Sequence, residues 1–224
     1  MTTINLTIEQ RKLLDLHLQL VLRENKTTNL TRIIDWSKAQ VLHVEDSLIG
    51  LPEIQSAPDG CYLDMGTGAG YPGIPVAIMT NRSTLLADSV GKKTKALDRM
   101  ILELGISEWV ATYNGRLEDL ALSKKNEFAV ITARALSSLP ALLELASPLL
   151  MNNGLLVCYK AQEVFDELPH SKEIASQLGM EYVSLRSAVL SDGSTHREIV
   201  VFKKIGEPSI KLPRRVGLAQ KKPL

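Results

Sequence analysis

The chain has 224 residues, of which 45% are apolar and 23% charged. This composition excludes a disordered or low-complexity chain, and the length suits one domain with an appendage better than two full domains. The net charge of +1 conceals an asymmetry, because seven Lys and Arg residues follow residue 202 with Glu207 as the sole acid there. A basic tail on an acidic body favours an anionic partner, and the alternative is a solvated terminus that keeps the protein soluble.

No apolar stretch approaches the roughly 18 residues that a bilayer span requires. The N-terminus also lacks the basic region and apolar core of a signal peptide. The sequence therefore predicts a cytoplasmic protein that does not contact a membrane.

The first fifty residues are predicted to be helical. Thr7 and Gln10 have the spacing of a capping box, and leucines and valines recur after them at helical intervals. Asp35 is the predicted N-cap of a second helix. The helical pattern is interrupted by Pro52, Pro58 and Asp59-Gly60, so we predict a boundary over 51–60.

From Cys61 onward, short apolar strands alternate with amphipathic helical stretches, which predicts a mostly parallel sheet covered by helices on both faces. The last two strands follow each other through the turn Ser191-Asp192-Gly193, so we expect them to pair antiparallel at one edge. The predicted strands lie near 61–65, 84–88, 109–113, 127–132, 154–159, 181–189 and 197–203. The predicted helices cover 74–80, 90–104, 139–147 and 162–178.

The strongest functional motif follows the first of these strands. An apolar segment ends at Asp64 and leads into alternating glycines at Gly66, Gly68 and Gly70. Such a turn lies where doubly wound sheets bind ligands, and glycine lets the ligand approach the backbone closely. The alternative is a purely structural turn between strand and helix.

Two cofactors are compatible with this turn. Gly68, Gly70 and Gly73 satisfy the dinucleotide pattern G-x-G-x-x-G, which is a weak signal by itself. The carboxylate of Asp64 would repel a pyrophosphate but tolerate the ammonium and sulfonium of S-adenosylmethionine. Asp88 ends the second strand, where an acid can accept both ribose hydroxyls of either cofactor; its alternative role is to cap the next helix.

Later strand ends contribute further candidates. The segment Gly115 to Glu118 follows the third strand, where a backbone amide and an acid could bind the adenine edge. Arg134 ends the fourth strand at the same edge of the sheet. A surface ion pair is the alternative role for this arginine.

A set of segments along the chain forms one combined pattern. They are the turn of 64–73, Asp88-Ser89 with Gly91-Lys92-Lys93, Arg116-x-Glu118, 132–135, 156–160, Thr28-Asn29-Leu30-Thr31, His43-x-x-Asp46-Ser47-Leu48 and 197–201. Taken together, these segments resemble the bacterial small-subunit ribosomal RNA guanine-N7 methyltransferases, also called glucose-inhibited division protein B. The resemblance spans almost the whole chain and implies a class I (Rossmann-like) fold that uses S-adenosylmethionine.

The resemblance also implies roles for individual residues. It adds Tyr71, Leu117 and Arg134 to the cofactor contacts expected at Asp64, Gly66, Gly68, Gly70, Asp88 and Glu118. Arg116 and Arg197 are expected to act on the RNA or the target base. Lys160, Arg214 and Arg215 are expected to bind RNA.

The expected reaction is methyl transfer from S-adenosylmethionine to guanine N7 in 16S rRNA, at the guanine numbered 527 in that RNA. The partner would be free 16S rRNA or the small ribosomal subunit, and the protein would act as a monomer. No histidine or cysteine cluster has the spacing of a zinc site, so no metal is expected. The remaining alternatives are a nicotinamide-dependent oxidoreductase and a non-catalytic RNA-binding protein with the same fold.

The expected organisation is an N-terminal helical subdomain over 1–57, an α/β domain over 58–205 and a basic tail over 206–224. Pro208, Pro213 and Pro223 oppose a helix in the tail. We therefore expect an extended arm that does not join the core.

Overall fold

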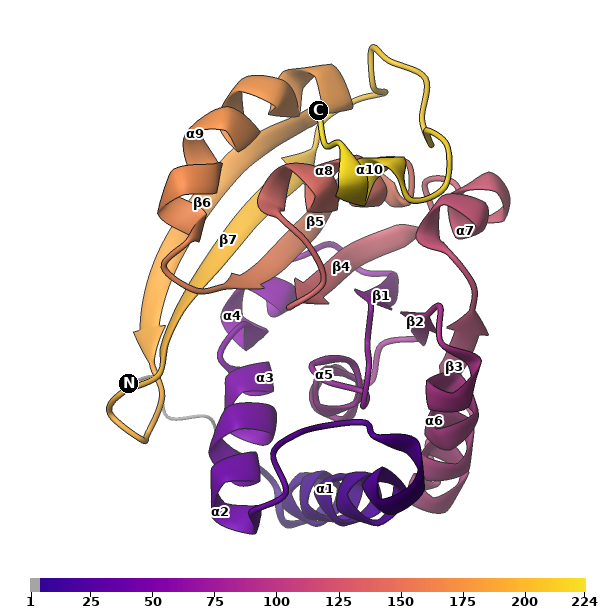
Figure 1. The fold of residues 1–224 in the computed structure, drawn as a ribbon, viewed down its shortest axis with the longest axis vertical. Helices are drawn as coiled ribbons and strands as arrows, with labels where there is room; N and C mark the ends of the chain where they lie inside the picture. The colour runs from indigo at the N-terminus through magenta and orange to yellow at the C-terminus, as the bar shows by residue number, and fades with distance from the viewer. Residues whose placement is uncertain (1–4) are drawn as a thin grey trace.

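The computed structural model describes residues 5–224, so the first four residues of the expected N-terminal subdomain lie outside the described part. Its centre is a seven-stranded sheet with the order β3-β2-β1-β4-β5-β7-β6 (Figure 1). The strands are β1 (Cys61–Met65), β2 (Thr84–Asp88), β3 (Val110–Asn114), β4 (Phe128–Arg134), β5 (Leu150–Lys160), β6 (Met180–Val189) and β7 (His196–Lys204).

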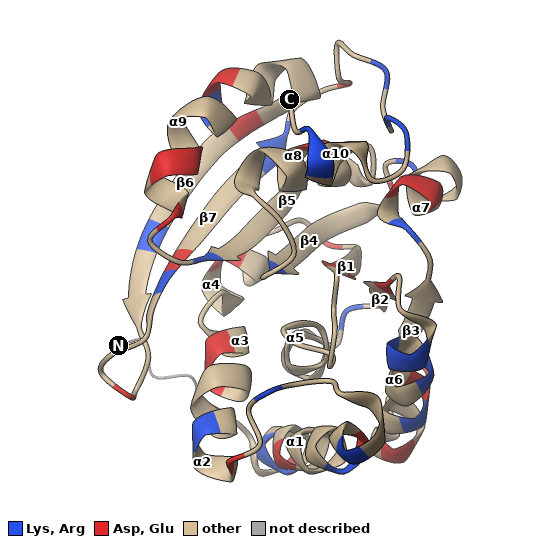
Figure 2. Ribbon diagram, viewed as in Figure 1, with Lys and Arg blue, Asp and Glu red and all other residues tan. Residues whose placement is uncertain are grey.

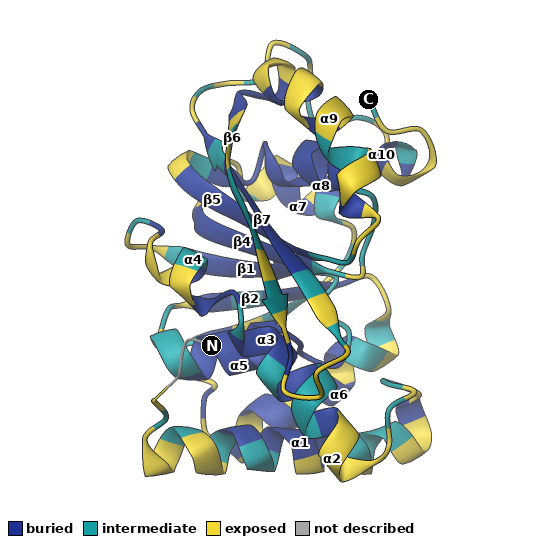
Figure 3. Cartoon of the chain, turned by 90° about the vertical axis from the view of Figure 1, so that its left-hand side faces the viewer, coloured by how far each residue is buried: buried dark blue, intermediate teal, exposed yellow. Residues whose placement is uncertain are grey.

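The strand directions confirm the expected α/β fold. The first five strands are parallel, whereas β7 pairs antiparallel with both β5 and β6. The central strands are buried along most of their length, and exposed residues appear on β6 at the sheet edge (Figure 3). β5 begins at Leu150, earlier than predicted, because an irregularity in its pairing with β4 accommodates the extra residues before Leu155.

Helices cover the two faces of the sheet (Figure 1). On one face lie α5 (Gly73–Thr80) and α6 (Gly91–Leu104), and on the other lie α7 (Leu117–Ser123), α8 (Leu139–Ala146) and α9 (Val164–Ala175), which continues into a 3₁₀ turn over Ser176–Leu178. Of these, α7 was not predicted, because its seven residues carry too short an apolar pattern.

The N-terminal helices confirm both predicted helix starts. Thr7 and Gln10 form the capping box of α1 (Ile8–Thr28), and the Asp35 carboxylate caps α2 (Trp36–Ala39). A π-helical turn over Gln40–Glu45 and α3 (Asp46–Leu48) continue α2. The helical run is interrupted just before Pro52, because α3 ends at Leu48 and a separate helix, α4 (Leu51–Gln55), follows. Pro52 occupies the first turn of α4, where its missing N–H has no helical partner to lose.

The N-terminal helices share a hydrophobic cluster with the sheet-covering helices. Leu18 and Val21 of α1 are fully buried in the same cluster as Ile74 of α5 and Leu97 of α6. This packing is continuous across residue 57, so it does not mark a domain boundary there. The predicted boundaries at 57 and 205 stay predictions. No helix within the described residues combines the length and apolar character that a membrane crossing requires.

The prediction of an extended arm at the C-terminus was wrong. Residues 218–221 form a short helix, α10 (Leu218–Lys221), and Ala219 is buried in the cluster that contains α8 and α9. The prolines do not prevent this, because none of the three lies within 214–222.

Candidate functional site

The glycine turn lies at the carboxyl end of β1. Gly66, Gly68 and Gly70 all adopt positive φ angles, which glycine tolerates best. A Cβ at Gly70 would come within 2.8 Å of the Ile74 side chain, so this glycine permits close packing against α5. Gly66 instead borders a pocket, where an added Cβ would come within 2.6 Å of the Leu136 side chain.

Asp64 lies beneath this turn and holds it in place. Its carboxylate accepts hydrogen bonds from the Gly73 backbone N–H at 3.0 Å and from the Thr132 hydroxyl at 2.7 Å. Burial raises the pKa of Asp64 to about 6, against the opposing effect of these donors. The residue therefore supports the turn from the core side and does not line the pocket predicted to hold the cofactor.

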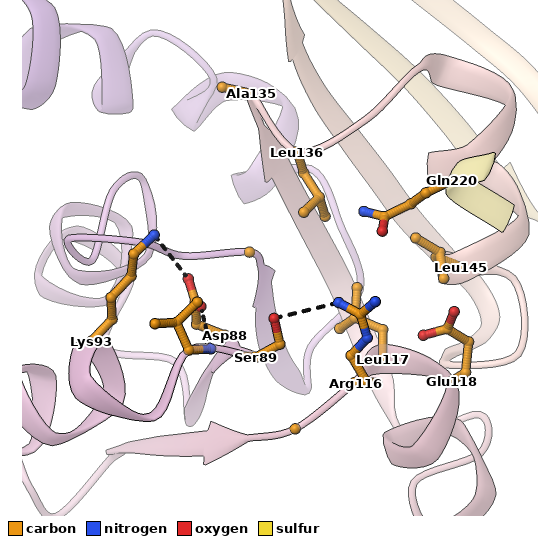
Figure 4. Close-up of a pocket in the computed structure, with 14 residues that line it drawn as sticks. Asp88, Ser89, Lys93, Arg116, Leu117, Glu118, Ala135, Leu136, Leu145 and Gln220 are labelled. Carbon is orange, nitrogen blue, oxygen red and sulfur yellow. Dashed lines mark hydrogen bonds and ion pairs between the residues drawn. The ribbon is translucent and has the colours of Figure 1, made fainter. Parts of the chain in front are cut away.

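The pocket has a volume of about 250 Å³ and opens at the carboxyl ends of β1, β2, β3 and β4 (Figure 4). It brings together five predicted site residues, namely Gly66, Asp88, Arg116, Leu117 and Glu118. The other lining residues include a leucine from the loop after β4, a leucine from α8 and one residue of α10. Gly68, Gly70 and Tyr71 do not line it.

Both carboxylates of the pocket also bind backbone. Asp88 accepts from the N–H of Val90 at 2.8 Å and from that of Gly68 at 3.1 Å, which ties the glycine turn to the end of β2. Glu118 accepts from the N–H of Gly217 at 2.6 Å. The capping alternative for Asp88 was wrong, because the N-cap of α6 is Val90 and no side chain caps that helix. Asp88 instead accepts from the N–H of Val90 and lines the pocket.

Arg116 immediately precedes α7 and points into the same pocket (Figure 4). Its guanidinium lies 3.5 Å from the Ser89 hydroxyl, which is a weak contact. This arginine therefore retains donors for a ligand.

A second pocket, of about 360 Å³, adjoins the first and shares Ala135 with it. Arg134, Lys160 and Arg197 line this second pocket, so the structure brings together three cationic residues that were predicted in different roles. Lys160 is paired with Glu167 at 2.8 Å. Arg116 and Arg197, which were both expected to act on the RNA or the target base, thus line neighbouring pockets.

Asp46 of α3 joins two of these cations. Its carboxylate is almost completely buried and lies 2.8 Å from Arg134 and 2.8 Å from Arg197. Sequence reasoning assigned Asp46 no role, although it stands in the segment His43-x-x-Asp46. The ion-pair alternative for Arg134 is therefore realised, with a buried partner.

Tyr71 lies in a buried aromatic cluster behind the turn. Its ring stacks on His43 at 4.7 Å and contacts His17 at 4.5 Å. Burial lowers the pKa of His17 to about 3 and that of His43 to about 4, so both histidines are neutral at pH 7. This position favours a packing role for Tyr71, which does not line the pocket.

The two tail arginines differ in their surroundings. Arg214 forms a two-pronged ion pair with Glu144 of α8, at 2.6 Å and 2.5 Å, and Glu144 is buried. Arg215 is exposed. The guanidinium of Arg214 is therefore engaged within the protein, while that of Arg215 faces solvent.

The sheet order, the reversed β7 and the glycine turn over a pocket at the strand ends define the class I methyltransferase fold. Among solved structures, an O-methyltransferase from Bacillus cereus in complex with SAH superposes with a TM-score of 0.59, at 17% identity, over 84% of this chain and 90% of that one. A similarity at this level of identity concerns the fold.

The family follows from the sequence comparisons. The family model described as rRNA small subunit methyltransferase G (GidB) matches residues 10–199. The protein named ribosomal RNA small subunit methyltransferase G from Carboxydothermus hydrogenoformans is 35% identical over 98% of this chain and 94% of its own length. Its namesake from Lactobacillus johnsonii is 34% identical over 89% of this chain and 85% of its own. The chain belongs to the rRNA small subunit methyltransferase G family.

Proposed function

We propose that this protein transfers a methyl group from S-adenosylmethionine to N7 of a guanine in 16S rRNA, the guanine numbered 527. The observation that carries the proposal is the adjacency of the two pockets, which meet at Ala135 on the carboxyl edge of the sheet in a member of this family. One pocket can hold the methyl donor while the other admits the acceptor base.

The first pocket has a donor set that fits S-adenosylmethionine. Asp88 stands where a carboxylate can accept ribose hydroxyls, and Leu117 and Glu118 stand where an adenine would lie. Acidic groups near the turn, Asp88 at its rim and Asp64 beneath it, suit the cationic methionine end better than a pyrophosphate. When bound, the cofactor supplies an electrophilic methyl group.

The chain's own residues have to position the acceptor, because guanine N7 carries a free lone pair and no proton. No general base is required, and alignment of N7 with the methyl group is the main contribution to the rate. We assign Arg116 and Arg197 to the RNA backbone or guanine O6, and Lys160 and Arg215 to phosphates. The convergence of Arg134, Lys160 and Arg197 on the second pocket supports this assignment.

Transfer of a labelled methyl group tests the proposal. Purified protein is incubated with labelled S-adenosylmethionine and either free 16S rRNA or small ribosomal subunits, and the labelled nucleoside is identified by mass spectrometry. We expect 7-methylguanosine at one position, and Arg197→Met should reduce the rate without preventing cofactor binding. Label in another base, or no transfer to either substrate, would contradict the proposal.

A melting experiment separates the proposal from the oxidoreductase alternative. S-adenosylhomocysteine should raise the melting temperature, because a ligand that binds only the folded state stabilises it, whereas NADH should have no effect. Stabilisation by NADH alone would favour hydride transfer. We further propose that the protein acts in the cytoplasm as a monomer.

A further inference from the structure

The C-terminal segment is docked beside the proposed cofactor pocket through polar contacts at several points. Arg214 pairs with the buried Glu144 and also donates to the Lys222 carbonyl at 2.8 Å. Gly217 donates to Glu118, a residue of the pocket itself. The terminal Leu224 carbonyl lies 2.7 Å from Nε2 of His170 on α9.

This docking brings Gln220 to the pocket. Ala219, its neighbour in α10, is 1% exposed and fixes the helix against the core, while the Gln220 side chain is exposed and lines the pocket. Figure 4 shows its carboxamide pointing inward from α10 beside Leu136 and Leu145, without a hydrogen bond to the other residues drawn. A polar group so placed can bind a ligand.

Gln220 lies at the end of the pocket that suits a purine. Leu136 and Leu145 provide apolar surface there, and Glu118 lies close by (Figure 4). A carboxamide offers one acceptor and two donors, which match the 6-amino group and a ring nitrogen of adenine. The flanking leucine side chains offer apolar surface against which a purine ring can pack.

We propose that Gln220 binds the adenine of the cofactor, so that the C-terminal segment is part of the cofactor site. This inference rests on the proposed function, because it names the ligand of the first pocket. It assigns to the tail a recognition role that is separate from any contact of its cations with RNA.

The test compares two homocysteine nucleosides by titration calorimetry. One is S-adenosylhomocysteine and the other is the analogue whose purine lacks the 6-amino group. The wild-type protein should prefer the first by roughly tenfold or more, and Gln220→Leu should lower this preference by a similar factor. Lys221→Leu, an exposed neighbour in the same helix, is the matched control and should behave as wild type.

The outcomes separate this inference from the function on which it rests. If the wild-type protein binds neither nucleoside, the proposed function fails and this inference with it. If the wild-type protein binds S-adenosylhomocysteine and Gln220→Leu retains both its affinity and its preference, this inference alone is overturned. Melting curves verify that the variants are folded, which the exposed position of Gln220 favours.

Discussion

Asp64 is completely buried and holds the glycine turn of the candidate site in place. Its oxygens accept hydrogen bonds from Gly73 and Thr132, and the side chain of Arg134 further favours its charge. Burial nevertheless outweighs these effects and raises the pKa of Asp64 from 3.8 to about 6. The folded state therefore binds a proton more readily than the unfolded chain does.

This raised pKa predicts a specific pH dependence of stability. Between pH 3.8 and about 6 the native carboxyl holds more proton than the unfolded one, so this group's contribution falls as the pH rises through that window. The contribution of Asp64 to the free energy of unfolding is fully present below its pKa in the unfolded chain and is lost above its pKa in the folded protein. This contribution changes by about 3 kcal/mol at most.

Urea unfolding of the wild-type protein and Asp64→Asn, at about pH 4.5 and about pH 7.5, measures this contribution. The difference in unfolding free energy between the two proteins should be larger at the acidic pH. Titration of His17 and His43 affects both proteins alike and cancels in the difference. An equal difference at both pH values would contradict the raised pKa.

At the scale of elements, Asp46 connects three separate parts of the fold. It lies at the start of α3 and pairs with Arg134 at the end of β4 and with Arg197 near the start of β7. Because both arginines line the second pocket, the ion pairs fix the position of the cations that the acceptor RNA would meet. The N-terminal helices thereby shape the candidate site without lining it.

Asp46→Ala should lower the free energy of unfolding by about 3–5 kcal/mol, because it leaves two partly buried guanidinium groups without their anion. Denaturant unfolding measures this change. Glu207→Ala is the control, since its pair with Lys125 is more than half exposed, and we expect a loss of about 1 kcal/mol or less. Equal losses in the two variants would show that burial of the Asp46 pairs contributes nothing.

At the scale of the whole molecule, the basic tail is less available to RNA than its composition indicates. Arg214 is paired with Glu144, and Lys204 is buried with its amine on the Ser147 carbonyl. Lys203 lies in β7, and the other cations lie on α10, next to it or in the loop that leads to it (Figure 2). Those that are exposed beyond residue 205 are Lys211, Arg215, Lys221 and Lys222.

Replacing Lys211, Arg215 and Lys222 together with Gln should flatten the salt dependence of RNA binding. Each lost phosphate contact reduces the slope of log affinity against log salt by about 0.7 for single-stranded RNA. S-adenosylhomocysteine affinity should stay unchanged, because these side chains do not line the pocket. Unchanged salt slopes would show that the tail cations make no RNA contact.

Deleting residues 207–224 is a different perturbation. The structure leads us to expect that this truncation weakens cofactor binding as well as RNA binding, since it removes Gln220 and the partner of Glu118. The extended arm expected from the sequence would instead have lost RNA contacts only. Comparing the truncation with the triple Gln variant separates the two proposed roles of the tail.

The sequence by itself determined the succession of strands and helices and the glycine turn at the end of β1. These features depend on short-range patterns, such as the apolar periodicity of α6 or the capping residues Thr7 and Asp35, which operate within a few neighbouring positions. Residues at parallel strand ends were also predictable, because parallel strands bring them to one edge; Asp88 and Glu118 reach the same pocket for this reason.

Only the tertiary structure decided which side chains pair across the chain. Asp46 meets Arg134 and Arg197 from 88 and 151 positions away, and Gly217 reaches Glu118 across 99 positions. No local pattern encodes such partners, because an ion pair or hydrogen bond depends on where whole elements pack. The docking of the tail also depends on contacts between distant elements. The prolines around the tail limit helix length, but the burial of Ala219 and the Arg214–Glu144 pair determine where the segment lies.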